Sequence, residues 1–304
     1  MTNPQSIPNY YATPGPLTDP GKHSDRLRGL PDDVDQLVKV VHQLGIYDVF
    51  ASDFYGVKLA DERVADIHLR SAESMLDAVF AVHDQPLTAR RTPEQRIGCR
   101  CHAFTKFILT LLRAKGIPAR ARCGFAVYFG PGQYEDHWVC EYWNTAEGHW
   151  VLVDAQMDEV WQEKLNMHWD VLDVPRDRFL VAADAWTRCR NGEANPEHFG
   201  ISFYEDMNGW WFIAGNLVRD AAALNKMEML PWDVWGAMPI REALTEEQFT
   251  YFDQLAELTR MPDDTFGELR ARYHSDDGLR VPQTVFNHLR QQSEVVDALK
   301  SAQS

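Results

Sequence analysis

The residues of this 304-residue chain best suited to act together chemically lie between Gly98 and Asp154. Cys101 begins an apolar run that ends at Gly116, and His137 and Asp154 follow in two segments of alternating pattern. A thiol, an imidazole and a carboxylate serve as nucleophile, base and orienting acid in covalent catalysis. The stretch therefore predicts a cysteine nucleophile assisted by a histidine and an aspartate.

The apolar run predicts a helix over residues 101–115, with apolar side chains at i, i+3, i+4, i+7 and i+8. Gly116 and Pro118 are typical of the end of a helix. Cys101 is therefore expected at the helix N-terminus, where the macrodipole favours an anion and lowers the pKa of a thiol. The backbone N–H groups at the same end can also stabilise an oxyanion.

Three strands are predicted after this helix, over residues 119–129, 137–143 and 149–154. Their short connections favour an antiparallel meander packed behind the helix. His137 begins the second strand and Asp154 ends the third, so we expect them to be neighbours. A helix lying across this sheet would then bring Cys101 to His137.

The order and spacing of these segments resemble the transglutaminase-like superfamily. The resemblance covers residues 95–157 and is carried by Cys101, Gly116-Ile117-Pro118-Ala119-Arg120, His137-Trp138-Val139-Cys140-Glu141 and Trp150-Val151-Leu152-Val153-Asp154. It implies an α+β fold with a papain-like core, in which a helix headed by the cysteine packs on an antiparallel sheet. It also implies that Cys101 is the nucleophile, His137 the base and Asp154 the orienting carboxylate.

Further segments are similar to a bacterial subgroup of that superfamily. They are Arg122-Cys123-Gly124-Phe125, Asp136-His137-Trp138, Val153-Asp154-Ala155-Gln156, Pro175-Arg176-Asp177-Arg178-Phe179-Leu180 and Asn216-Leu217-Val218-Arg219-Asp220. The first three lie in the expected core and the last two in a C-terminal extension. This similarity does not specify a substrate.

The chain departs from the family pattern just after the nucleophile. The family often has Cys-Arg-Asp-Phe, whereas this chain has Cys101-His102-Ala103-Phe104, with Cys99 two residues earlier. Counting back from Gly116 favours Cys101 and leaves Cys99 as the alternative nucleophile. Two other interpretations are a metal site, for which a fourth ligand is not evident, and a strained Cys99–Cys101 redox pair. We expect neither a metal nor a cofactor.

Four residues near the expected triad are candidates for substrate binding: His102, Arg122, Trp138 and Gln156. The alternative to substrate binding for His102 is a packing or surface position. For Arg120 and Arg122 the alternative is to form ion pairs with carboxylates. The many tryptophans are typical of packed clusters, and some of them are candidates for lining an acyl pocket.

The rest of the chain suggests three parts. Residues 1–24, rich in Pro, Gly, Asn and Ser, predict a flexible arm, with docking of Tyr10 and Tyr11 as the alternative. Residues 25–172 are expected to form the catalytic core, with helical runs over 30–45 and 63–82. Residues 173–304 are expected to form a mostly helical extension packed on the core, with helices over 179–191, 210–224, 245–260, 264–273 and 282–299.

Composition narrows the class of protein. The 45 acidic residues outnumber 30 lysines and arginines, for a net charge of -15, which argues against a nucleic-acid partner. Five cysteines, an odd number, do not form a disulfide framework and favour a reducing compartment. No signal peptide and no membrane-spanning run are evident, so we expect a cytoplasmic protein without a membrane partner. The oligomeric state is not predicted.

Together these features predict cysteine-dependent acyl transfer through a thioester acyl-enzyme. The donor would be an amide or thioester in a small molecule, a peptide or a carrier-bound acyl group, and the acceptor an amine or water. Amide formation, protein crosslinking and hydrolysis by a cysteine peptidase or amidase all stay open. The competing class is a non-catalytic transglutaminase-like scaffold that binds a partner.

Overall fold

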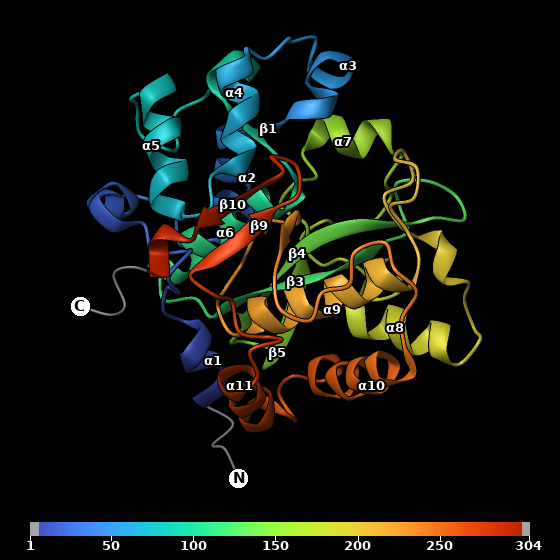
Figure 1. Cartoon of the computed structure of the whole chain (residues 1–304). Helices are drawn as coiled ribbons and strands as arrows, with labels where there is room; N and C mark the ends of the chain where they lie inside the picture. The colour runs from blue at the N-terminus through green and yellow to red at the C-terminus, as the bar shows by residue number, and fades with distance from the viewer. Residues whose placement is uncertain (1–5, 300–304) are drawn as a thin grey trace. The chain divides into compact units, whose positions relative to one another are not determined.

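The computed structural model describes residues 6–299, and its mixed helices and sheet confirm the expected α+β class (Figure 1). The described chain divides into two compact units. The N-terminal unit comprises residues 6–121 and 139–174, and the C-terminal unit comprises residues 122–138 and 175–299. The expected division into a catalytic core of 25–172 and an extension of 173–304 stays a prediction.

The N-terminal unit contains most of the helices that precede the sheet. Its helices are α1 (Ser6–Tyr11), α2 (Val34–Leu44), α3 (Ala51–Tyr55), α4 (Asp61–Ala65), α5 (Ala72–Val82), α6 (Cys101–Ala114) and α7 (Glu159–Lys164). Its strands are β1 (Gly45–Tyr47), β2 (Ile97–Cys99) and β5 (His149–Val153). The expected helical run over 63–82 is broken before α5, because Ser71 caps a new helix by accepting the Ser74 N–H.

Helix α6 is buried along almost its whole length, and α2 and α5 pack against it. The sequence predicted its apolar stripe, but the structure also buries its polar side. Thr110 donates to the Lys106 carbonyl at 2.8 Å, and Arg113 Nε donates to the Ala119 carbonyl at 3.0 Å. Hydrogen bonds of this kind offset the cost of burying polar groups, and they fix the helix that begins at Cys101.

Residues 6–24 are docked on the N-terminal unit, in place of the expected flexible arm. Tyr11 is only 1% exposed and packs edge-on against Trp150. Thr18 accepts from Arg113 Nη1 at 2.7 Å, and the Leu17 carbonyl accepts from Ala72 N–H. The prolines of this segment lack the N–H groups that a regular strand or helix needs. They do not prevent the segment from packing on the unit through single buried side chains such as Tyr11 and Leu17. Residues 1–5 of the expected arm lie outside the described residues.

The main sheet has the strand order β5-β4-β3-β6, with β7 also beside β4. It comprises β3 (Ala119–Ala126), β4 (Tyr134–Asn144), β5, β6 (Phe179–Val181) and β7 (Phe199–Gly200). The expected order of the first three strands is confirmed. Strands β4 and β5 are antiparallel, with Cys140 opposite Val153, and β3 and β6 are antiparallel, with Gly124 opposite Val181. Strands β6 and β7 were not predicted.

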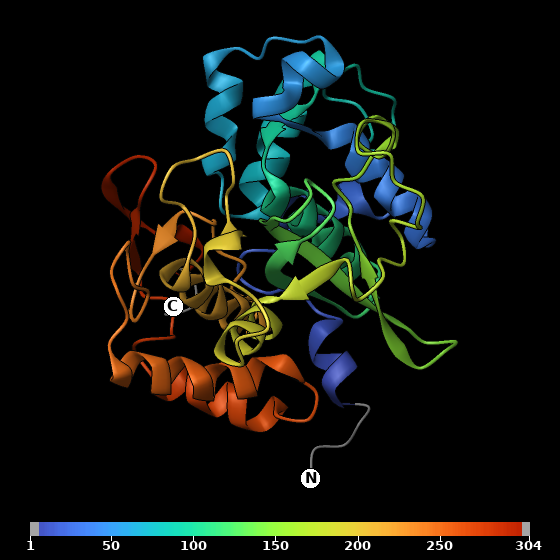
Figure 2. The ribbon, with the colours of Figure 1, turned by 90° about the vertical axis from the view of Figure 1, so that its right-hand side faces the viewer.

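The C-terminal unit contains four helices and a small second sheet. The helices are α8 (Ala182–Arg190), α9 (Trp210–Leu224), α10 (Glu246–Arg260) and α11 (Phe266–Ser275), of which α10 and α11 are the orange pair in Figure 2. Helix α9 has the predicted bounds. Helix α10 begins after a capping box formed by Thr245 and Gln248. No helix within residues 6–299 is long and apolar enough to cross a bilayer.

The helix predicted over 282–299 is wrong. This segment forms a hairpin of β9 (Thr284–Asn287) and β10 (Gln292–Val295), the red strands of Figure 1, and β9 also pairs with β8 (Asp233–Val234). Val285 and Asn287 are buried with a less buried residue between them, which is the period of a strand. Gln291 has a φ of 51°, which places it in a turn rather than in a helix.

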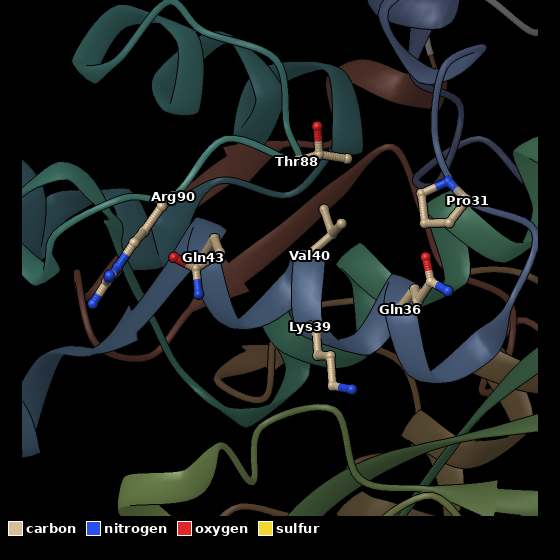
Figure 3. Close-up of a pocket in the computed structure, with 7 residues that line it drawn as sticks. All are labelled: Pro31, Gln36, Lys39, Val40, Gln43, Thr88 and Arg90. Carbon is tan, nitrogen blue, oxygen red and sulfur yellow. The ribbon is translucent and has the colours of Figure 1, made fainter.

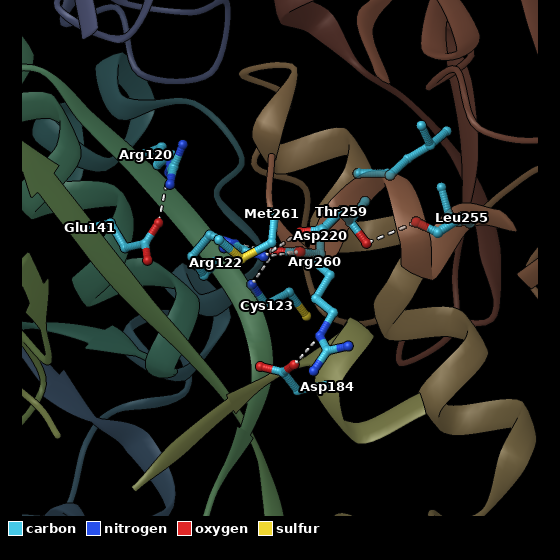
Figure 4. A network of polar contacts seen from close by, with 12 residues as sticks. Arg120, Arg122, Cys123, Glu141, Asp184, Asp220, Leu255, Thr259, Arg260 and Met261 are labelled. Atoms are coloured by element: carbon cyan, nitrogen blue, oxygen red, sulfur yellow. Dashed lines mark hydrogen bonds and ion pairs between the residues drawn. The ribbon is translucent and has the colours of Figure 1, made fainter. Parts of the chain in front are cut away.

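Buried ion pairs hold the two arginines of β3 (Figure 4). In the N-terminal unit, Arg120 Nε donates to Glu141 at 2.7 Å, and the guanidinium stacks 4.1 Å from the Trp150 ring. In the C-terminal unit, Arg122 makes two hydrogen bonds to Asp220 at 3.1 and 2.8 Å. Arg120 and Arg122 therefore both form buried ion pairs with carboxylates, which was the alternative to substrate binding.

Replacing Glu141 by leucine should destabilise the protein by about 3–5 kcal/mol, because Arg120 would stay buried without its partner. The double variant Arg120→Met with Glu141→Leu should recover most of that loss, since an apolar pair needs no compensation. Urea unfolding measures both. Asp35→Asn, which breaks an exposed pair with Lys39, should leave the midpoint almost unchanged. A single Glu141→Leu variant as stable as the wild type would contradict the expectation.

Candidate functional site

Cys101 is the first residue of α6, as the sequence predicted. The segment before it is fixed by β2, which pairs in parallel with β1 so that Cys99 lies opposite Tyr47. Arg100 precedes the helix, and its side chain pairs with Asp48 instead of capping the helix. The first N–H groups of a helix have no acceptor within it, so this end can host a negative charge beside the thiol.

Cys99, the alternative nucleophile, lies in the interior of the N-terminal unit. It has no exposed surface, and burial is the main cause that raises the pKa of its thiol well above the ordinary value. Its Sγ packs so closely on Gly45 that a Cβ there would come within 2.7 Å. A thiolate is the reactive form, so these surroundings disfavour Cys99 and favour Cys101.

Asp154 follows β5 in the N-terminal unit and is 1% exposed. Its N–H donates to the Val171 carbonyl at 2.9 Å. Its Oδ1 accepts from the Gln156 N–H at 3.1 Å, which forms a local turn. The backbone groups of Val171 and Gln156 therefore fix the position of Asp154 and its carboxylate.

Gln156 is buried, and neither Nε2 nor Oε1 of its carboxamide has a hydrogen-bond partner among the described residues. A buried amide left in this state costs about 1–3 kcal/mol. Buried polar groups that lack partners are rare and call for an explanation. The sequence singled out Gln156 as a substrate-binding candidate but did not indicate this property.

His42, on α2 of the N-terminal unit, is a histidine that the sequence did not single out. Burial lowers its pKa, while the carboxylates of Asp158 and Asp154 act in the opposite direction. Its Nε2 is buried without a hydrogen-bond partner among the described residues. In the sequence, His42 is only a polar residue in the last turn of an amphipathic helix, and this is a weak indication of a functional role.

His137 lies on β4 in the C-terminal unit and is 1% exposed. Its ring is packed edge-on by three aromatic rings, with centroids at 5.0 Å for Phe129, 5.8 Å for Tyr128 and 6.4 Å for Phe179. This packing restricts the plane of the imidazole. Trp138, the next residue, is also buried.

The other two substrate-binding candidates have structural surroundings of their own. His102 is buried in α6, and burial, followed by the charges of Lys106 and Arg100, lowers its pKa well below the ordinary value. Arg122 already faces Asp220 and the Thr259 carbonyl. The substrate roles of His102, Arg122 and Trp138 stay predictions.

A hollow of about 400 Å³ opens on the N-terminal unit beside α2 (Figure 3). It is lined by Pro31, Gln36, Lys39, Val40, Gln43, Thr88 and Arg90, none of which is a candidate catalytic or substrate-binding residue. Lys39 is paired with Asp35 at 2.6 Å. Among the described residues, no group of three or more His, Cys, Asp and Glu side chains is arranged to hold a metal ion.

Replacing His102 by leucine should flatten the pH dependence of stability. The folded-state pKa of His102 is lowered, so below about pH 6.5 the unfolded chain binds a proton that the folded chain does not. Stability is then lost as pH falls. Between pH 7.5 and 5.5 the wild type should lose about 1 kcal/mol more than His102→Leu. Urea unfolding at both pH values tests this, and exposed His149→Gln should keep the wild-type slope.

Comparison with family models agrees with the sequence pattern. The model described as the transglutaminase-like superfamily matches residues 70–155, a range that includes Cys101, His137 and Asp154. Neither the curated proteins nor the solved structures gave a match. The match begins before α5 and ends just after β5, so it takes in α6 and the first three strands of the main sheet. Over residues 70–155 the chain is therefore similar to the transglutaminase-like superfamily.

Proposed function

We propose that this protein catalyses cysteine-dependent acyl transfer, with Cys101 as the nucleophile. The observation that carries the proposal is the position of Cys101 at the N-terminus of a buried helix within the matched segment. The transglutaminase-like superfamily commonly includes enzymes. The helix end supplies N–H groups next to the reacting sulfur, and these are suited to a developing oxyanion.

In the proposed reaction, the Cys101 thiolate attacks the carbonyl carbon of an amide or thioester. The carbonyl electrons move to oxygen, where the N–H groups at the start of α6 stabilise the charge. His137, which has taken the thiol proton, returns it to the departing amine or thiol as the thioester forms. An amine or water then attacks the thioester, and His137 takes the proton of that acceptor. The carbon–sulfur bond breaks, which releases the acylated product, and the Cys101 sulfur regains the proton held by His137.

Asp154 is proposed as the carboxylate that orients His137, within a papain-like core. The register of β4 and β5 pairs Cys140 with Val153, the residue before Asp154. His137 lies three residues before Cys140 on the same strand. This register supports an orienting role for Asp154, which would hold the imidazole in the useful tautomer.

Gln156 is proposed to bind the acyl donor. Its buried carboxamide offers an NH2 group that donates and an oxygen that accepts, and a substrate amide offers the matching acceptor and donor. Gln156 is tied to Asp154 through the local turn, so it belongs to the same small region as the orienting carboxylate. Among the open outcomes this favours amide donors over thioesters, which lack an N–H.

The pH dependence of iodoacetamide alkylation tests the nucleophile. Cys101 should react selectively below pH 7, and His137→Ala should lower its rate at pH 6 by about 100-fold, because the thiol loses its general base. Mass spectrometry of the labelled sites measures this. Cys189 serves as an internal reference, because burial raises the pKa of its thiol to about 12.

Cys101→Ala provides the control for site assignment, since the fast-reacting site should disappear. If Cys101 reacts no faster than Cys189, the catalytic proposal fails and the non-catalytic scaffold takes its place. If Cys101 is fast but insensitive to His137→Ala, the assignment of the base is wrong.

A second experiment tests Gln156. Iodoacetamide has an amide N–H, whereas N,N-dimethyl-2-iodoacetamide does not. Relative to Cys189, Cys101 of the wild type should prefer iodoacetamide by about tenfold, the effect of one hydrogen bond. Gln156→Met should abolish that preference and raise the free energy of unfolding, because an unpaired buried amide is removed. An unchanged preference would exclude Gln156 from donor binding.

A further inference from the structure

Within the C-terminal unit, a side chain of α9 holds the residue that precedes His137. Asn216 Nδ2 donates to Asp136 Oδ1 at 2.8 Å. Asn216 is 1% exposed, and Asp136 is partly buried. Burial raises the pKa of Asp136, and the Asn216 hydrogen bond opposes that shift. The contact thus links α9 directly to β4 at the position next to the proposed base.

The orientation of the Asn216 carboxamide is itself fixed. Arg219 Nη1 donates to Asn216 Oδ1 at 3.1 Å, and Arg219 Nη2 lies 3.5 Å from the Asp233 carbonyl. A guanidinium can only donate, so the oxygen of the amide must face Arg219 and its nitrogen must face Asp136. Arg219 folds over Gly215, where an added Cβ would come within 2.8 Å of Nη1.

The same face of α9 also holds β3. Asp220, four residues after Asn216, accepts from Arg122 and from the Cys123 N–H at 2.9 Å (Figure 4). Residues four apart lie one above the other on a helix. Helix α9 therefore makes two polar attachments, one to β4 through Asn216 and one to β3 through Asp220.

We propose that Asn216 is a positioning residue for His137. Asp136 and His137 are adjacent, so fixing Asp136 sets the backbone from which the imidazole extends. The rings of Phe129, Tyr128 and Phe179 pack the imidazole, and Asn216 fixes its point of attachment. This inference rests on the proposed role of His137 as the base.

Asn216→Ala tests the inference through the pH profile of Cys101 alkylation. The rate at pH 6 should fall by about tenfold and the profile should move to higher pH, because small errors in the placement of a catalytic group are costly. The matched control is Asn225→Ala. Asn225 is a buried asparagine that directly follows α9, and its side-chain Nδ2 donates to the Ala221 carbonyl. It should leave the rate within twofold.

A swapped pair separates positioning from general loss of structure. Asp136→Asn combined with Asn216→Asp restores the hydrogen bond with donor and acceptor exchanged, and Arg219 then donates to a carboxylate in place of an amide oxygen. This double variant should recover the wild-type profile to within threefold. The ¹⁵N signals of the His137 ring, assigned with His137→Gln, should change in Asn216→Ala and return in the swapped pair.

The outcomes distinguish this inference from the proposed function. If His137→Ala leaves Cys101 alkylation unchanged, the proposed function fails, and the positioning role fails with it. If His137→Ala slows alkylation but Asn216→Ala does not, only the positioning role is overturned. It is also overturned if Asn225→Ala slows the reaction as much as Asn216→Ala, or if the swapped pair recovers nothing.

Discussion

The structure depends on the burial of α6. Buried polar side chains on this helix need hydrogen-bond partners, and Arg113 donates to Thr18 and to the Ala119 carbonyl, while Thr110 donates to the backbone of α6 itself. The backbone N–H groups of the first turn are the part of the helix that cannot be satisfied from within. The packing around α6 holds its N-terminus in place, and the free N–H groups make that end electropositive. Cys101 lies at this end.

The strands that follow are held by charged side chains as well as by the backbone ladder. Arg120 is neutralised by Glu141, and Arg122 by Asp220. Burying these charges costs desolvation free energy. Each pair also favours a single arrangement of the strands, because a buried charge separated from its partner is strongly destabilising. Asn216 adds a hydrogen bond to the side chain of Asp136, the residue before His137.

The sequence predicted what local patterns encode. The spacing of apolar residues, together with the residues that begin and end helices, predicted α6, the order of β3 to β5 and the bounds of α9. The distance to Gly116 predicted that Cys101 begins α6. The sequence did not predict contacts between distant segments, such as Asn216 with Asp136 or Tyr11 with Trp150. Nor did it predict the unpaired amide of Gln156 or the hairpin of β9 and β10, because burial and strand partners decide both.

The docked N-terminal segment has a consequence for how the chain folds during synthesis. Tyr11 and Thr18 leave the ribosome before their partners Trp150 and Arg113, which emerge about a hundred or more residues later. Contacts of such long sequence separation form slowly. The segment that holds Tyr11 and Thr18 therefore stays undocked, and accessible to proteases and chaperones, until the helix and strands that carry the candidate site have been made.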